Sequence, residues 1–179
     1  MLGTNLIIIS PFPSGVIRVG GDMGDPTRVV PALLQLGRAL ALLGRIDEAR
    51  PYVAEAMVIT RANPTIASLL GIIAGEAAEL GVAGEVVEIL TLAPAGFWRD
   101  AALAELQGDS IEAADMYRGM GAPTLEAGAR FVAAERLLGE GRTADALAEL
   151  EKALAFYRSV RATFYLERGE ALLREAKSA

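Results

Sequence analysis

Apolar residues recur at helical spacing from residue 26 to the C-terminus. In the first stretch they stand at positions 29, 30, 33, 36, 40 and 43, which places them on one face of an α-helix. Asp25 precedes this stretch as an N-cap candidate, and Pro26 suits the first helical position. Gly44 then supplies a turn. The pattern predicts a helix from 26 to about 43 and a second one that ends near 61.

Clusters of proline and glycine divide the rest of the chain. Asn63-Pro64, the run 93–96 and the run 121–123 each interrupt an apolar pattern of helical period. Between these breaks we expect helices near 65–80, 85–92, 97–107, 110–120, 124–139, 143–158 and 161–176.

A glycine followed five residues later by an alanine marks several of the turns. The pairs are Gly44 with Ala49, Gly108 with Ala113, and Gly141 with Ala146. Counting Gly81 as the turn of a less regular unit, successive turn glycines lie 37, 27 and 33 residues apart. Periods of this length are typical of stacked helical hairpins. The sequence therefore predicts an all-α solenoid of about four antiparallel helical hairpins plus a C-terminal capping helix.

The turn residues belong to a longer pattern that resembles the tetratricopeptide repeat (TPR). The first unit carries Leu36-Gly37, Leu40, the run 44–49, Val53 and Ala56, and the fourth carries the run 141–146 with Leu150 and Ala153. The second unit departs from the pattern, with Val86 in place of the turn alanine, and the fourth has Ala133-Ala134 where Leu-Gly is expected. The resemblance implies a right-handed α-solenoid whose first helices line a concave groove.

Residues 1–25 differ from the repeat domain expected over 26–179. Their density of proline and glycine predicts an irregular or flexible N-terminal leader. Residues 6–9 and 16–19 could pair as a short hairpin, or the segment could be disordered. The run 15–22 resembles a phosphate-binding loop only in its glycines, because no Gly-Lys-Ser/Thr follows. No apolar run reaches the length of a signal peptide or a membrane span, so we expect no membrane association and a cytoplasmic location.

Composition excludes several kinds of chemistry. The chain has no histidine and no cysteine, which removes the Ser-His-Asp and Cys-His catalytic arrangements and most zinc sites. The net charge is −6, and residues 61–121 hold 3 basic and 9 acidic groups. Such a chain is repelled by phosphate backbones, so no nucleic acid partner is expected. We expect no enzyme activity, no catalytic residue and no cofactor.

An acidic stretch in the second unit is the nearest approach to a metal site. Glu76, Glu79, Glu85 and Glu88 could in principle bind Mg²⁺ or Ca²⁺. Oxygen ligands for Ca²⁺ usually come from a tight loop, whereas these residues are predicted on two helices. We therefore favour a solvated helical face and expect no metal site.

The candidate partner-binding residues lie on predicted first helices. They are Arg38, Arg99, Arg130 and Glu135. Arginine in a concave groove could bind a carboxylate of a partner. The alternative for Arg130 is a local pair with Glu126, four residues earlier on the same helix, and this alternative is favoured. The carboxylate clamp of chaperone-binding TPR proteins is not expected, because no lysine precedes Lys152.

Two functions are consistent with these features. The first is a non-catalytic scaffold that binds a partner peptide or helix on the concave face. The second follows from the C-terminal residues 153–160, 164–168 and 170–173, which resemble the TPR tails of large bacterial regulators. It is a regulatory or oligomerisation tail of a bacterial signalling ATPase, nucleotide cyclase or transcriptional regulator, with self-association through the solenoid ends. A mean hydropathy of +0.35 favours an exposed apolar end of this kind.

Overall fold

The computed structural model describes residues 25–178, and these residues form helices and short turns without any β-strand. The leader, with its possible hairpin and its glycine-rich run, lies outside the described residues. The elements, in chain order, are α1 (Pro26–Leu42), α2 (Ile46–Ala62), the 3₁₀-helix η1 (Pro64–Glu76), α3 (Ala77–Leu80), α4 (Ala83–Leu92), α5 (Phe97–Leu106), α6 (Ser110–Gly119), α7 (Pro123–Gly139), α8 (Thr143–Ser159) and α9 (Thr163–Ser178).

The predicted helices appear within a few residues of their expected bounds, with one exception. The segment expected as a single helix over 65–80 is instead the 3₁₀-helix η1 followed by the short helix α3. This segment contains Gly71 and Gly75, and glycine weakens an α-helix by about 1 kcal/mol relative to alanine. The single-helix prediction was therefore wrong for this segment, because its composition favours the α-helix less than its apolar spacing suggested.

The helix ends follow the turn chemistry of the sequence. Asp25 caps α1, since its side chain accepts a hydrogen bond from the backbone N–H of Thr27 at 2.9 Å. At the other end Gly44 has φ +73°, the left-handed region that glycine adopts without strain. Its N–H donates to Ala41 at 2.8 Å, and the N–H of Arg45 donates to Leu40 at 2.9 Å. This is a Schellman motif, which ends the helix and satisfies its last carbonyls.

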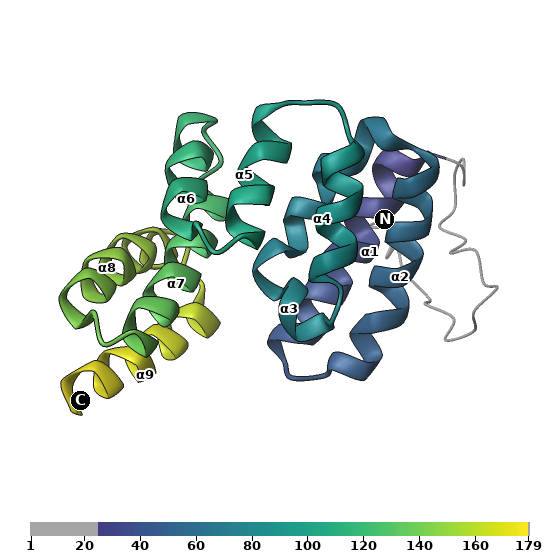
Figure 1. The fold of residues 1–179 in the computed structure, drawn as a ribbon. Coiled ribbons are helices and arrows are strands. Elements are labelled where there is room, and N and C mark those ends of the chain that lie inside the picture. The colour runs from purple at the N-terminus through teal and green to yellow at the C-terminus, as the bar shows by residue number, and fades with distance from the viewer. Residues whose placement is uncertain (1–24, 179) are drawn as a thin grey trace, which may run out of the picture.

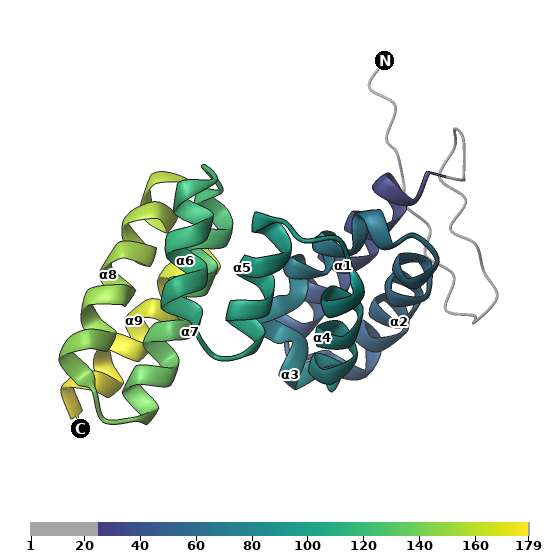
Figure 2. The ribbon, with the colours of Figure 1, turned by 45° about the horizontal axis from the view of Figure 1, so that its top comes forward.

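The helices follow one another through space in chain order. Figure 1 and Figure 2 show α1 to α4 at one end of the molecule, α7 to α9 at the other, and α5 and α6 between them. Elements that follow one another along the chain pack against each other. We group them as the pairs α1 with α2, η1 and α3 with α4, α5 with α6, and α7 with α8, followed by α9. Two contacts join the first elements of neighbouring pairs, that of α1 with η1 and that of η1 with α5. Three apolar clusters result: one extends from α1 to α5, one from α5 to α7, and one from α7 to α9.

Small residues allow the helices to approach closely. A Cβ added at Gly37 of α1 would lie 2.6 Å from Cγ2 of Val53 on α2. One added at Gly169 of α9 would lie 2.5 Å from Cδ2 of Leu154 on α8. Both distances are far below van der Waals contact, so each pair of helices is closer than any larger residue permits. The glycine of the Leu36-Gly37 pair is thus a packing requirement between α1 and α2.

This contact makes a stability prediction. Gly37→Ala should lower the free energy of unfolding by about 1–3 kcal/mol, because Val53 is fully buried and has a stiff side chain that cannot move aside. Gly84 of α4 is the control, since a Cβ there meets nothing within 4 Å. Gly84→Ala should leave the stability unchanged or raise it by up to about 1 kcal/mol. Urea unfolding measures both, and equal effects of the two substitutions would contradict the close packing of α1 and α2.

Candidate functional site

A cleft of about 230 Å³ crosses the first element of each successive pair of helices. Its walls come from α1, η1, α3, α5, α7 and α9, and none of its lining residues belongs to α2, α4, α6 or α8. The charged and aromatic residues that line it are Arg38, Glu76, Glu79, Glu105, Phe131, Glu135, Phe164, Tyr165 and Arg168. The cleft therefore unites side chains that are up to 130 positions apart in the sequence.

Arg38 extends from α1 across one end of the cleft. Its Nε donates to Oε1 of Glu76 on η1 at 3.1 Å. Its guanidinium also reaches α7, since a Cβ added at Gly128 would lie 3.5 Å from Nη2 of Arg38. Burial opposes the charge on Arg38, but the carboxylate of Glu76 outweighs that effect and holds the pKa of Arg38 above its usual value. Arg38 thus stays cationic and links three elements around the cleft.

The hydrogen bond from Arg38 reaches only one of the two carboxylate oxygens of Glu76. Its residue surface is 8% exposed, and its Oε2 is buried without a hydrogen-bond partner within the described part of the chain. Buried polar atoms nearly always have a partner, so an unpaired carboxylate oxygen calls for an explanation. A carboxylate can only accept, so the missing group is a donor.

Glu105 of α5 faces the same space. The hydroxyl of Tyr117 on α6 donates to its Oε2 at 3.3 Å. Burial, and then the negative charge of Glu76, raise the pKa of Glu105 to about 7, against the opposing effects of Tyr117 and Arg38. Glu105 is therefore divided between its neutral and charged forms near neutral pH.

The far side of the cleft is formed by α7 and α9. Arg168 of α9 donates to Oε1 of Glu135 on α7 at 2.6 Å, and its Cζ lies 5.2 Å from the centre of the Phe131 ring. Burial raises the pKa of Glu135, although Arg168 opposes this shift. Tyr165 stacks on Tyr157 of α8 with ring centres 4.2 Å apart, which fixes this aromatic wall from behind.

The balance of charge around the cleft is negative. Four glutamates and two arginines line it, so it carries two net negative charges when all six groups are ionised. The remaining lining residues are apolar or glycine. The lining of the cleft therefore combines an excess of carboxylates with aromatic side chains.

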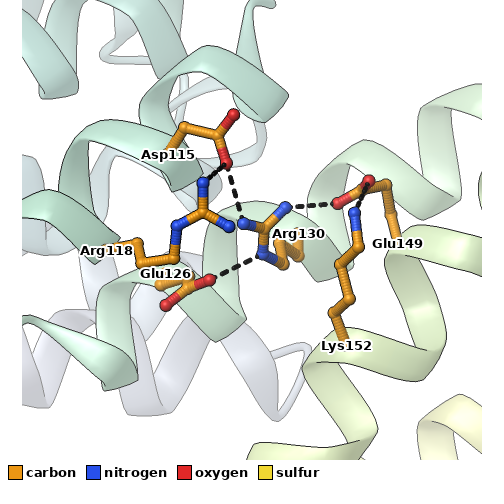
Figure 3. A network of polar contacts seen from close by, with 6 residues as sticks. All are labelled: Asp115, Arg118, Glu126, Arg130, Glu149 and Lys152. Carbon is orange, nitrogen blue, oxygen red and sulfur yellow. Dashed lines mark hydrogen bonds and ion pairs between the residues drawn. The ribbon is translucent and has the colours of Figure 1, made fainter.

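A second polar cluster, separate from the cleft, surrounds Arg130 of α7. Figure 3 shows the guanidinium between three carboxylates, and its nitrogens donate to Glu149 at 2.6 Å, to Glu126 at 2.9 Å and to Asp115 at 2.9 Å. Lys152 and Arg118 extend the network to its ends. Burial disfavours the charge of Arg130, but these hydrogen bonds outweigh it and raise the pKa of Arg130. The cluster joins α6, α7 and α8.

The four candidate residues separate into two groups. Arg38 and Glu135 line the cleft. Arg130 is 2% exposed and fully paired, so it is not presented to a partner; the favoured alternative, the pair with Glu126, is present. Arg99 also lies outside the cleft, because it bonds Asp100 and the carbonyl of Ala93.

The acidic stretch also separates into two parts. Glu85 and Glu88 pair with Arg61 on a partly exposed surface, which agrees with the expected solvated face. Glu76 is buried in the cleft, so that expectation was wrong for Glu76. Glu79 is exposed on α3, as expected, and also lines the cleft. Glu105, Phe131 and Arg168 were not predicted as site residues. The spacing of apolar residues along the chain does not indicate that α5, α7 and α9 contribute to the same cleft.

The chain matches no protein-family model, no curated protein and no solved structure in comparisons of each kind. Within residues 25–178, none of the helices has both the length and the apolar character that a membrane crossing requires. Over the same residues, no three acidic side chains come together in a way that could hold a metal ion.

The Arg130 network predicts a large loss of stability on substitution. Arg130→Met should lower the free energy of unfolding by roughly 2–4 kcal/mol, because Glu149 keeps only Lys152 as a partner and Glu126 and Asp115 lose the cation that they share. Arg142→Met, which removes an exposed pair with Asp145 on α8, should have almost no effect. Chemical unfolding of both variants measures the difference. A small loss for Arg130→Met would show that the network contributes little to the packing of α6, α7 and α8.

The raised pKa of Glu105 predicts a pH dependence. The folded chain holds this proton up to about pH 7, whereas the unfolded chain loses it near the ordinary value of 4.5. The contribution of Glu105 to stability is thus fully present below pH 4.5 and is lost as the pH rises through 7. Over that range it is on the order of 3 kcal/mol.

Glu105→Gln isolates this contribution, because glutamine does not titrate and still accepts from Tyr117. The decrease in unfolding free energy between pH 5 and pH 8 should be smaller in Glu105→Gln than in the natural chain. Glu112→Gln, an exposed change on α6, serves as the control and should keep the original slope. Identical slopes in all three proteins would contradict the burial of an ionisable Glu105.

Proposed function

We propose that this chain is a non-catalytic protein-interaction module, a right-handed TPR-like α-solenoid that binds a partner peptide or helix in the cleft on its concave face. The observation that carries the proposal is the origin of the cleft-lining residues. All of them belong to α1, η1 with α3, α5, α7 and α9, the first elements of the successive pairs. In the repeat family that the sequence resembles, the first helices are the ones that line the groove.

The contacts between elements support the solenoid arrangement. Each helix packs on its neighbours in the chain, and among the first elements α1 packs on η1, which in turn packs on α5 and α7, as expected for stacked repeats. Left-handed glycines stand at Gly44, Gly81, Gly108 and Gly141, the four turns that define the predicted repeat. About four hairpins and a closing helix α9 account for this order.

The cleft suits binding because its side chains are already held in place. Arg38 is fixed by Glu76, and Arg168 by Glu135, while the aromatic wall is held by the stacking of Tyr165 on Tyr157. A ligand that enters such a site does not have to order the side chains that contact it, so a small interface can still bind. The absence of histidine and cysteine from the sequence supports a binding function over catalysis.

A second candidate function is self-association, as expected of a regulatory or oligomerisation tail. Leu92 and Phe97, on either side of the turn between α4 and α5, are 79% and 75% exposed, and Trp98 next to them is 47% exposed. Large apolar side chains that gather on a surface often mark a contact between proteins. Light scattering of the purified chain tests this function: a concentration-independent monomer would rule it out for the isolated chain.

The binding proposal is tested by blocking the cleft chemically. The natural chain has no cysteine, so a single introduced cysteine can be labelled with a bulky maleimide. Glu79 and Ala78 are adjacent exposed residues of α3, and only Glu79 lines the cleft. Peptides of twelve residues selected from a random library against the natural chain should lose at least about tenfold in affinity when Glu79→Cys is labelled.

The unlabelled Glu79→Cys variant and the labelled Ala78→Cys variant are the controls. The first measures the loss caused by removing the Glu79 carboxylate alone, and the label should weaken binding at least about tenfold beyond that loss. The labelled Ala78→Cys variant should retain binding within a few fold of the natural chain. Fluorescence anisotropy measures all four affinities. If every selected peptide bound equally well with the label at position 79, the cleft would not be the binding surface.

A further inference from the structure

The cleft contains more carboxylates than its own cations neutralise. Arg38 bonds Oε1 of Glu76 and Arg168 bonds Oε1 of Glu135. Over residues 25–178 neither Glu79 nor Glu105 forms an ion pair. Oε2 of Glu76 remains buried without a donor. The site therefore lacks a donor at one defined atom and is negatively charged around it.

We propose that the cleft binds a lysine or arginine side chain of a basic partner segment, with its cationic group held by Glu76 and by the neighbouring carboxylates Glu79, Glu105 and Glu135. The proposal rests on the proposed function and specifies the chemistry of the partner. A cation supplies the donor that Glu76 lacks and also reduces the net charge of the cleft. A neutral donor would do only the first, and an acidic partner would do neither.

The walls of the cleft favour a cation on an alkyl stem. Phe131 already accepts a cation on its ring face, since Arg168 lies 5.2 Å above it. Phe164 and Tyr165 line the same side, and Phe164 is partly exposed. Aromatic faces attract ammonium and guanidinium groups and also pack against their methylene chains. Lysine and arginine side chains have both parts.

The arrangement of the carboxylates fits an organic cation better than a metal ion. Glu76, Glu79, Glu105 and Glu135 come from four different elements around the cleft. They form no cluster of the kind that holds a metal, as far as the described residues extend. A metal requires ligands at one point, whereas an elongated side chain can meet carboxylates along its length.

Binding of a cation should depend on pH in a definite direction. The charged groups around Glu105 are Arg38 of α1, Glu76 of η1, Glu79 of α3, Glu135 of α7 and Arg168 of α9, with the hydroxyl of Tyr117 from α6. The pKa of Glu105 is about 7 in the free chain. A bound cation favours ionised Glu105, so affinity for the cation should rise between pH 6 and pH 8.

The test uses four capped peptides, Ac-Ala-Ala-Xaa-Ala-Ala-NH₂, in which Xaa is lysine, arginine, norleucine or glutamate. Titrations followed by ¹⁵N NMR report both affinity and location, even for weak binding. At pH 8 the lysine or the arginine peptide should shift amides of the cleft and bind about tenfold or more tightly than the norleucine peptide. The glutamate peptide should bind weakest.

Variants of the carboxylates identify the groups responsible. Glu76→Gln keeps an oxygen for Arg38 but removes the charge, and it should reduce the preference for lysine or arginine over norleucine by about tenfold. Its NMR spectrum reports whether it is folded. Glu79→Gln, an exposed change, is a second variant that should reduce the same preference without a risk to folding. Glu167→Gln, exposed on α9 outside the cleft, should leave the preference unchanged.

The outcomes distinguish this inference from the proposed function. If peptides shift the cleft amides equally for all four choices of Xaa, the cation proposal is wrong and the cleft remains a binding surface. The same holds if the selected twelve-residue peptides bind in the cleft without lysine or arginine. Selected peptides that ignore the label on Glu79→Cys would overturn both proposals.

Discussion

The close approach of helices at residues without side chains is the constraint on which the rest of the structure depends. At Gly37 and Gly169 there is no room for a Cβ, so α1 meets α2, and α9 meets α8, at short range. Glycine has a second effect where the elements around the cleft approach one another. A Cβ at Gly75 would lie 3.3 Å from Oε1 of Glu105, and Gly128 faces Arg38. The same residue type thus closes the contacts within the pairs and leaves space in the cleft between them.

The buried Arg130 and the half-buried Arg38 differ in how completely their carboxylate partners are hydrogen-bonded. Arg130 has three carboxylates at 2.6–2.9 Å and no remaining need for a partner. Arg38 has one, and that carboxylate keeps an unpaired oxygen. A buried charge that lacks part of its hydrogen bonding destabilises the fold. Over residues 25–178 the one buried side-chain oxygen without a partner lies in the cleft, which is where the proposed ligand would supply the missing donor.

The sequence was sufficient for the helices and for most of their ends, because apolar spacing and turn glycines are local signals. The prediction was wrong at η1, because the apolar spacing there indicated an α-helix although Gly71 and Gly75 weaken one. The sequence would also not have shown that Arg161, with φ +54°, occupies a left-handed turn position at the end of α8. Glycine takes that position at five earlier turns, at Gly44, Gly81, Gly108, Gly121 and Gly141, whereas arginine takes it here.

How much of the site could be predicted depended on how far apart in the sequence the contacting residues lie. The pair of Glu126 with Arg130 spans four residues on one helix and was visible in the sequence. The contacts of Arg130 with Asp115 and Glu149 span 15 and 19 residues, and that of Arg38 with Glu76 spans 38. Such contacts depend on how helices pack, which no local pattern encodes. Arg38 and Glu135 were identified only through the resemblance that assigns first helices to a groove.

The most direct test of the account is a crystal structure of this chain with a selected peptide bound. If the cleft is the binding surface, the peptide lies along α1, η1, α5, α7 and α9, with a lysine or arginine nitrogen within ion-pair distance of Glu76. A peptide seated instead on α2, α4, α6 or α8, with the cleft empty, would contradict it.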